Sequence, residues 1–289
     1  MVSSPDVLAA RTAALRAGVA RLGSVLVAFS GGADSALVLA VAAEVLGPGR
    51  TVAATAVSPS LPSAELAAAR TFADGLGVEH LLPGTAELDR PGYVANAGDR
   101  CYFCKSELVD VLAPLAVERG LAAVATGTNA DDAVAGFRPG IRAAAERGAV
   151  TPLLDAGLTK ADVRAASRAM GLPTWDKPAA ACLSSRVAYG VPVTAERLAR
   201  VERAEVAVRA ALLAAGVASR DLRVRDLGDV AGAGTARLEV DAAVVDRVAA
   251  AAGVRAAVLA AGFDAVEVDP RGFRSGAMNE VLLPLPGPR

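Results

Sequence analysis

An apolar segment, residues 24–29, leads directly into Ser30-Gly-Gly-Ala-Asp-Ser35, and a helical pattern over residues 36–46 follows. A buried strand that turns through two glycines into a helix exposes several backbone N–H groups at the helix N-terminus, where the macrodipole favours an anion. The two serines of the turn add hydroxyl donors, and its aspartate can cap the helix or help to hold a magnesium ion. The sequence therefore predicts a phosphate-binding loop; the alternative is an ordinary strand-to-helix turn.

The spacing of this loop separates it from two common nucleotide-binding motifs. The turn lacks the Gly-Lys-Ser/Thr ending of the Walker loop, and no Gly-x-Gly-x-x-Gly follows the strand. The chain is therefore not a Walker-type protein, and a dinucleotide site is disfavoured.

Strand and helix patterns alternate along the first 175 residues. We expect strands at residues 24–29, 51–57, 78–82 and 122–126, and helices at 8–22, 36–46, 63–75, 105–119 and 159–170. Strands that alternate with helices of this length indicate a parallel sheet covered on both faces. The predicted fold class is α/β, with this parallel sheet in an N-terminal domain of residues 1–175.

The remaining chain, residues 176–289, has a different pattern. Residues 175–190 show no regular period and are interpreted as a functional loop. A long helix from Thr194 to about Ala215 follows, and then strands near 222–227, 236–240 and 266–268 and a helical stretch over 243–261. This order predicts a smaller C-terminal α+β domain that carries the loop.

Charge and hydropathy exclude several classes of protein. The 289 residues include 30 basic and 31 acidic side chains, so a net charge of −1 gives no basic footprint for nucleic acid. The mean hydropathy of +0.41 comes from alanine and valine spread along the chain, and charges interrupt every apolar run before it reaches membrane-spanning length. Residues 1–11 do not resemble a secretory signal, so we expect a cytoplasmic, reducing location without a membrane partner.

Three cysteines are the other chemical feature. Cys101 and Cys104 form a Cys-x-x-Cys pair, Cys182 lies in the irregular loop, and His80 is the single histidine. Zinc would need a fourth ligand, a redox pair would leave one thiol over, and all three side chains can also be plain buried residues. Three thiolates can also hold a [4Fe–4S] cluster in which one iron has no protein ligand.

The loop at residues 30–35 resembles the PP-loop of the ATP pyrophosphatase superfamily. Residues 127–132, Gly-Thr-Asn-Ala-Asp-Asp, are similar to the second nucleotide-facing segment of that superfamily, whose members cleave ATP between the α and β phosphates and form adenylated intermediates. The resemblance implies ATP and Mg²⁺ as ligands, bound by Ser30, Gly31, Gly32, Asp34, Ser35, Gly127, Asn129 and Asp131. Lys160 and Arg164, one helical turn apart, either face the triphosphate or only solvate their helix.

Five further segments together resemble the LarE family. They are residues 100–105, 137–140, 152–160, 181–190 and 272–280. LarE proteins are ATP-dependent sulfur transferases that mature the nickel-pincer nucleotide cofactor of lactate racemase. The resemblance implies that ATP adenylates a carboxylate of a pyridinium dicarboxylate mononucleotide and that Cys182 is the catalytic, sulfur-delivering residue. In family members with three cysteines, the thiols that match Cys101, Cys104 and Cys182 hold a [4Fe–4S] cluster with an extra sulfide, and we favour that version here.

The substrate is expected in the C-terminal domain. The resemblance implies a nucleotide substrate held by Arg186, Arg223, Arg225, Glu239, Arg274 and Ser275. Two arginines at positions i and i+2 of a strand point the same way and suit a phosphate dianion, although an ordinary charged strand face has the same pattern. The chain departs from the family at Leu227-Gly-Asp229, where the family reads His-Gly-Asp, and residues 231–235 resemble an insertion.

Other functions share part of this pattern. A PP-loop tRNA thiolase or an ATP-dependent amidating enzyme has the same loop, and the neutral charge disfavours the thiolase. A non-catalytic ATP or metal sensor is the alternative outside enzymes. We expect a sulfur transferase with a small-molecule nucleotide substrate, working as a homo-oligomer.

Overall fold

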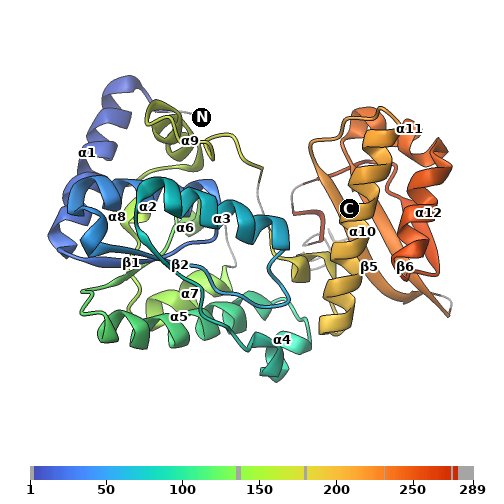
Figure 1. Ribbon diagram of the computed structural model, residues 1–289, viewed down its shortest axis with the longest axis horizontal. Coiled ribbons are helices and arrows are strands. Elements are labelled where there is room, and N and C mark those ends of the chain that lie inside the picture. Colours follow the sequence, from blue (N-terminus) through green and yellow to red (C-terminus); the bar gives the residue numbers. More distant parts are fainter. Residues whose placement is uncertain (1–2, 135–137, 179–180, 231, 275, 279–289) are drawn as a thin grey trace, which may run out of the picture. The chain divides into compact units, whose positions relative to one another are not determined.

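The computed structural model describes residues 3–134, 138–178, 181–230, 232–274 and 276–278 (Figure 1). The chain divides into two compact units. Unit 1 comprises Met1–Glu87 and Cys101–Ala180, and unit 2 comprises Leu88–Arg100 and Ala181–Arg289. Each unit has its own sheet, and the two are described separately.

Unit 1 is built on a parallel sheet with the strand order β3-β2-β1-β4. The strands are β1 (Val25–Ala28), β2 (Thr51–Ala54), β3 (Glu79–Leu81) and β4 (Val124–Ala125). All three pairings between them are parallel. The predicted α/β class with a parallel sheet is therefore confirmed, and the C-terminal ends of β1 and β4 lie at one edge of the sheet.

Helices cover both faces of this sheet (Figure 1). They are α1 (Pro5–Leu22), α2 (Ala33–Leu46), α3 (Ser63–Leu76), α5 (Arg100–Glu118), α6 (Ala130–Val134), α7 (Pro139–Glu146), α8 (Pro152–Asp155) and α9 (Lys160–Ala169). Helix α5 begins at Arg100, ahead of the expected start at Lys105, so Cys101 and Cys104 lie in its first turns.

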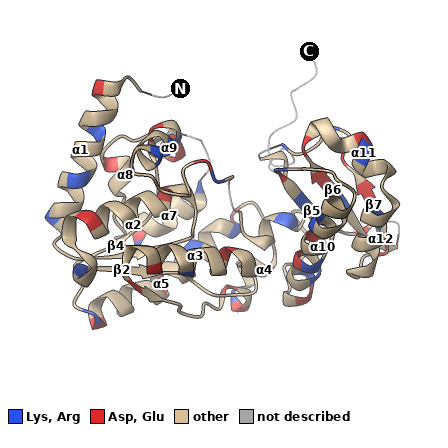
Figure 2. Cartoon of the chain, turned by 45° about the horizontal axis from the view of Figure 1, so that its top comes forward, with Lys and Arg blue, Asp and Glu red and all other residues tan. Residues whose placement is uncertain are grey.

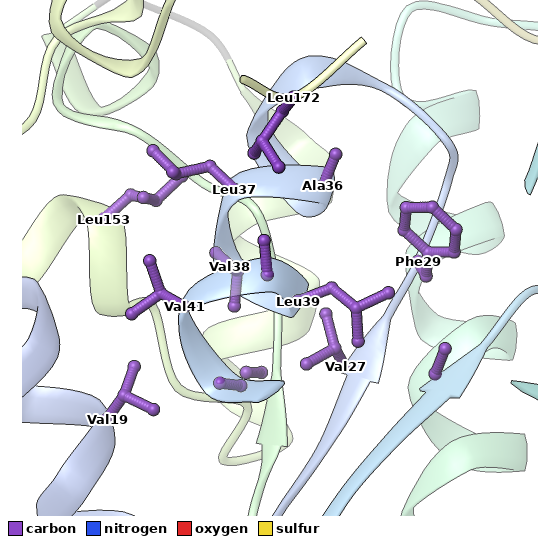
Figure 3. Packing of buried hydrophobic residues seen from close by; sticks show 14 of the residues in the cluster. Val19, Val27, Phe29, Ala36, Leu37, Val38, Leu39, Val41, Leu153 and Leu172 are labelled. Carbon is purple, nitrogen blue, oxygen red and sulfur yellow. The ribbon is translucent and has the colours of Figure 1, made fainter. Parts of the chain in front are cut away.

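Helix α2 is the centre of the apolar core (Figure 3). Residues 36–42 of this helix are all buried, because α1, α3, α8 and α9 pack around it over the sheet. Full burial of a side chain such as Leu37 or Val41 contributes about 1.5–3 kcal/mol. On the opposite face, Leu112 and Ala116 of α5 pack on Leu26 of β1. The loop between β1 and α2 therefore starts and ends in rigid structure.

Unit 2 is a smaller α+β unit whose sheet has the order β5-β6-β7. Its elements are α4 (Pro91–Val94), the 3-10 turn η3 (Leu183–Arg186), α10 (Ala195–Ala214), β5 (Leu222–Val230), β6 (Ala233–Val240), α11 (Val245–Ala250), α12 (Ala252–Ala260) and β7 (Ala265–Val268). Strands β5 and β6 are antiparallel, and β6 and β7 are parallel. The described part of residues 231–235, the expected insertion, belongs to the tip of the β5–β6 hairpin and the start of β6.

Two local features differ from the sequence pattern. The helix expected over residues 243–261 is interrupted at Ala251, whose ψ of 95° is extended, so α11 and α12 are separate helices. Strand β5 has an irregularity between Asp226 and Asp229, where Gly228 adopts a φ of +75°.

In the described part of the chain, no helix combines the length and apolar character needed to cross a membrane.

Candidate functional site

The predicted phosphate loop connects β1 to α2. Gly31 has a φ of +72°, a conformation that glycine adopts without strain, and Gly32 is the N-cap residue of α2. The Ser30 and Ser35 hydroxyls are 3.1 Å apart, and the Ser35 Oγ also accepts from the Ser30 backbone N–H at 3.2 Å. The N-terminus of α2 begins directly at this turn, so its first N–H groups are available to an anion.

The second predicted nucleotide segment lies against this loop. A Cβ atom on Gly127 would lie 2.7 Å from the Ser35 nitrogen, so only glycine allows the chain after β4 to approach the first turn of α2 so closely. Asn129 is buried, and its Nδ2 donates to Asp34 Oδ1 at 3.3 Å. The structure thus brings the two predicted ATP-binding segments together at the C-terminal edge of the parallel sheet, where open α/β sheets bind ligands.

Helix α9 adds a lysine to this group. Lys160 Nζ donates to Asp34 Oδ2 at 2.5 Å, and the backbone N–H of Lys160 donates to Asp131 Oδ2 at 2.8 Å. Both carboxylate oxygens of Asp34 are therefore hydrogen-bonded. Arg164, its neighbour on α9, donates instead to the backbone oxygens of Trp175 and Lys177.

Lys177 contacts the loop of residues 30–35, and the sequence pattern did not predict this contact. Its Nζ donates to the Gly31 carbonyl oxygen at 2.9 Å and to Glu65 Oε2 at 2.6 Å. Its position in an irregular segment gives no periodic signal, and only the packed structure places it beside residues 30–35.

The Cys-x-x-Cys pair lies in unit 1, at the start of α5. Cys101 is exposed, Cys104 is half-buried, and neither is in a disulfide. Residues three apart on a helix lie on the same face, so both thiols face one side of α5. A Cβ on Gly140 of α7 would lie 3.1 Å from the Cys101 carbonyl oxygen, so α7 packs closely on this turn. Among the residues that the structure describes, no three His, Cys, Asp or Glu side chains are grouped as a metal site.

Cys182 belongs to unit 2, where it is the N-cap residue of the 3-10 turn η3. Arg186, at the end of η3, folds back onto this turn: its Nη1 donates to the carbonyl oxygens of Ala181 and Cys182, the latter at 3.0 Å. The Nε of Arg186 donates to Glu205 Oε1 of α10 at 2.9 Å. The structure therefore uses Arg186 to hold the backbone at Cys182.

Strand β5 and helix α10 of the same unit both carry charged residues, which Figure 2 marks in colour. Arg225 Nη1 donates to the Ser185 carbonyl oxygen at 3.0 Å, and its Nη2 donates to Glu239 Oε2 at 2.6 Å. The Nε of Arg225 is buried and has no hydrogen-bond partner among the residues that the structure describes. Arg223 is also buried, with its guanidinium 5.2 Å from the centre of the Phe273 ring.

These arginines form a cationic group. Burial lowers the pKa of Arg223, and the positive charges of Arg186 and Arg225 lower it further, while Glu205 opposes this shift. The carboxylates of Glu205 and Asp221 act on Arg223, and that of Glu239 accepts from Arg225. Because the guanidiniums of Arg186, Arg223 and Arg225 repel one another, an anion bound here would relieve repulsion. The structure thus brings together four of the predicted substrate residues, Arg186, Arg223, Arg225 and Glu239, in the unit that carries Cys182.

The last two predicted substrate residues follow Phe273. Arg274 is half-buried, directly after a residue whose N–H donates to the Val240 carbonyl oxygen of β6 at 2.7 Å. Ser275 lies outside the described residues.

A loop of this kind, between the first strand and helix of a parallel sheet, defines a nucleotide-binding protein of the PP-loop class. The asparagine synthase family of that class matches residues 11–256. The chain is also 35% identical over 278 residues to the pyridinium-3,5-bisthiocarboxylic acid mononucleotide synthase of Lactiplantibacillus plantarum, covering 95% of this chain and 96% of that protein. An uncharacterized protein of Synechocystis is 42% identical over 271 residues, 93% of this chain and 96% of its own length.

These matches extend across both units, beyond the PP-loop alone. The chain belongs to the LarE family, within the PP-loop superfamily. Membership makes it an ATP-dependent enzyme, and the resemblance to this family that was found in the sequence is confirmed.

Proposed function

We propose that this enzyme is an ATP-dependent sulfur transferase that converts a carboxylate of a pyridinium dicarboxylate mononucleotide into a thiocarboxylate during nickel-pincer cofactor biosynthesis. The observation that carries the proposal is a thiol, Cys182, in a turn whose backbone is held by Arg186 and Arg225, two members of a buried cationic group. A nucleotide with a phosphate and two carboxylates has the charge that this group requires. The synthase of Lactiplantibacillus plantarum carries a product of this type in its name.

Activation of the carboxylate is assigned to unit 1. The N-terminus of α2 and the backbone of residues 30–35 bind the phosphates of ATP, and pyrophosphate leaves when the carboxylate attacks the α phosphorus. Asn129 fixes the carboxylate of Asp34 by donating to its Oδ1. This carboxylate can bind a magnesium ion once the hydrogen bond from Lys160 to Asp34 Oδ2 breaks. Mg²⁺ would supply charge neutralisation for the leaving pyrophosphate. The residues proposed for ATP are Ser30, Gly31, Gly32, Asp34, Ser35, Gly127, Asn129 and Asp131.

Sulfur transfer is assigned to unit 2. The thiolate of Cys182 attacks the acyl carbon of the acyl-adenylate, and the C–O bond to AMP breaks. Cleavage of the Cβ–S bond, with loss of the Cα proton, then leaves the thiocarboxylate and a dehydroalanine at position 182. The substrate is proposed to bind to Arg186, Arg223, Arg225, Glu239, Arg274 and Ser275.

The Cys-x-x-Cys pair supports an alternative route, in which the transferred sulfur is a cluster-bound sulfide and Cys182 keeps its thiol. Two thiols on one face of α5, outside any disulfide, fit two of the ligands of a [4Fe–4S] cluster, and Cys182 is proposed as the third. When bound, such a cluster would supply an extra sulfide as the sulfur to be transferred. The chain's own part is to provide three thiolates and leave one coordination position open.

Three further assignments complete the proposal. The domain boundary at 175/176 separates an ATP-binding part from a part with the cysteine loop and the substrate. The enzyme works in the cytoplasm, where thiols stay reduced. It assembles as a homo-oligomer.

The proposal is tested by release of pyrophosphate and AMP from Mg–ATP with one candidate acceptor at a time. We expect release with the pyridinium dicarboxylate mononucleotide and none with total tRNA or with aspartate and ammonia. Release with tRNA and incorporation of sulfur into it would identify a thiolase instead. ATP binding without release with any acceptor would identify a sensor.

A further inference from the structure

The segment Leu88–Arg100 contacts the turn that follows Cys182, and both belong to unit 2. Asn96, at its centre, is fully buried and has a φ of +54°, in the left-handed region. Few residues other than glycine adopt this conformation, and asparagine is among the most tolerant of it. A buried polar residue with an uncommon backbone conformation persists where the surrounding structure requires it.

The side chain of Asn96 binds the backbone of the turn. Its Nδ2 donates to the carbonyl oxygens of Ala188 at 2.8 Å, Val191 at 2.9 Å and Val187 at 3.3 Å. Its own backbone oxygen accepts from the Gly190 N–H at 3.1 Å. The carbonyl groups of Val187, Ala188 and Val191 lie outside the helices and strands that the structure describes, and the Asn96 amide supplies hydrogen-bond donors to them.

Two neighbours of Asn96 extend these contacts toward the thiol. The Arg100 Nη1 donates both to Asn96 Oδ1 and to the Ser184 carbonyl oxygen, the latter at 2.7 Å. The hydroxyls of Tyr93 and Ser184 are 2.5 Å apart. Ser184 is two residues after Cys182, so the contacts that begin at Asn96 end next to the reacting residue.

Two sets of side chains thus bind the backbone of residues 181–191. Asn96 and Arg100 bind its carbonyl groups at residues 184, 187, 188 and 191, while Arg186 and Arg225 bind those at residues 181, 182 and 185. Each bond of a guanidinium to a carbonyl is charge-assisted and stronger than a neutral one. The arginine set also belongs to the proposed substrate group, whereas Asn96 is uncharged and fully buried.

We propose that Asn96 is a positioning residue for sulfur transfer, which fixes the backbone from Cys182 to Val191 so that the thiol keeps one orientation. The proposal rests on the sulfur-delivering role of Cys182 under the proposed function. Attack on an acyl carbon requires the sulfur to be placed accurately, and a small misplacement lowers the rate strongly. Adenylation requires bound substrate, in which Arg186 is proposed to take part, but it does not require a fixed position of the Cys182 sulfur. At saturating substrate it therefore does not depend on this placement.

The test uses the full-length protein with Asn96→Gly, which keeps the left-handed conformation and removes the amide. We expect the rate of sulfur transfer to fall about tenfold or more, while substrate-dependent pyrophosphate release stays within about twofold. Tyr93→Phe removes a single hydroxyl from the same contacts and should lower sulfur transfer in the same direction by a smaller factor. This milder variant keeps the test valid if the glycine variant folds poorly.

The matched control is Val258→Ala on α12, which removes buried methyl groups from unit 2 at a position outside residues 181–191. It lowers stability through a cavity, so a loss of sulfur transfer in this variant at an equal drop in melting temperature would show that stability alone is responsible. That result, or a folded Asn96→Gly protein with the wild-type transfer rate, overturns the proposal.

A second readout is independent of the sulfur-transfer activity. The rate at which iodoacetamide alkylates Cys182, followed by peptide mass spectrometry, should rise about fivefold or more in Asn96→Gly and stay unchanged in Val258→Ala, because a released turn exposes the half-buried thiol. If the wild-type enzyme transfers no sulfur but this difference is found, the proposed function fails and the positioning of the thiol stands. An unchanged alkylation rate in Asn96→Gly contradicts the positioning role.

Discussion

Asp34 is held in place at the proposed ATP site by single residues from two other segments. Its two carboxylate oxygens accept from Asn129 and Lys160, residues that follow β4 and begin α9. Gly127 permits this arrangement, since a Cβ there would lie 2.7 Å from the Ser35 nitrogen and 3.1 Å from Asp34 Cβ. One methyl group at this position would push two segments of the proposed ATP site apart.

The substitution Gly127→Ala should therefore weaken ATP binding. Overpacking of this kind costs about 1–3 kcal/mol, and we expect the Kd measured by calorimetry to rise about tenfold or more. Gly75→Ala is the control, because among the described residues a Cβ at that position in α3 meets no atom within 4 Å beyond its chain neighbours and the nearby backbone of its own helix. An unchanged Kd for Gly127→Ala would show that residues 127–132 do not need to approach the loop to bind ATP.

His80 is a single titrating group close to the loop. Its Nε2 is 2.8 Å from Thr55 Oγ1, and the Thr55 hydroxyl already donates its proton to the Phe29 carbonyl oxygen at 2.7 Å. The ring nitrogen is therefore the donor. Burial lowers the pKa of His80, and the charge of Arg70 lowers it further against the opposing charge of Asp74.

A lowered pKa makes stability depend on pH. The unfolded chain binds the proton more readily than the folded chain, so the contribution of His80 is complete above the unfolded pKa of about 6.5 and is lost as the pH falls below it. The loss cannot exceed about 1.4 kcal/mol per pH unit. Urea unfolding at pH 7.5 and 5.5 should show a larger fall for the wild type than for His80→Gln, which keeps an N–H donor but does not titrate. Equal falls in both proteins would remove His80 from the pH dependence.

At the scale of elements, local signals predicted some boundaries and missed others. Helix α10 begins after Thr194, whose side chain accepts from the Arg197 N–H, and α9 begins after Thr159 with a full capping box; both starts were visible in the sequence. The start of α5 at Arg100 was not visible in the sequence. The side chain of Arg100 binds Asn96 and the Ser184 carbonyl oxygen, and no local sequence pattern predicts such contacts. The Cys-x-x-Cys pair was therefore found by its spacing while its place on a helix was not.

Because α5 presents both thiols on one face, it should contribute to iron binding. Protein purified without oxygen is expected to hold about four irons per chain with matching acid-labile sulfide. Cys101→Ser should lose most of this iron, whereas Tyr102→Phe, which removes only a hydroxyl bonded to Glu146, should keep it. Absence of iron after reconstitution, or full iron in Cys101→Ser, would leave Cys182 as a donor that is used once.

Considered as a whole, the molecule divides the proposed chemistry between its two units. Unit 1 holds the nucleotide loop, and unit 2 holds Cys182 among buried arginines. The parallel sheet and the two nucleotide segments were predictable, since strand and helix periods are local and parallel strands end at one edge. Two other features could not be predicted, because they join residues far apart in the sequence. They are the inclusion of residues 88–100 in unit 2 and the contact of Lys177 with Gly31.

The central claim is that adenylation and sulfur transfer are separate steps and that Cys182 serves the second. A single-turnover reaction with Mg–ATP and the pyridinium dicarboxylate mononucleotide tests it, with pyrophosphate and thiocarboxylate measured in the same sample for the wild type and Cys182→Ala. The account predicts both products from the wild type, and pyrophosphate without thiocarboxylate from the variant. Thiocarboxylate formation by Cys182→Ala at the wild-type level would contradict it.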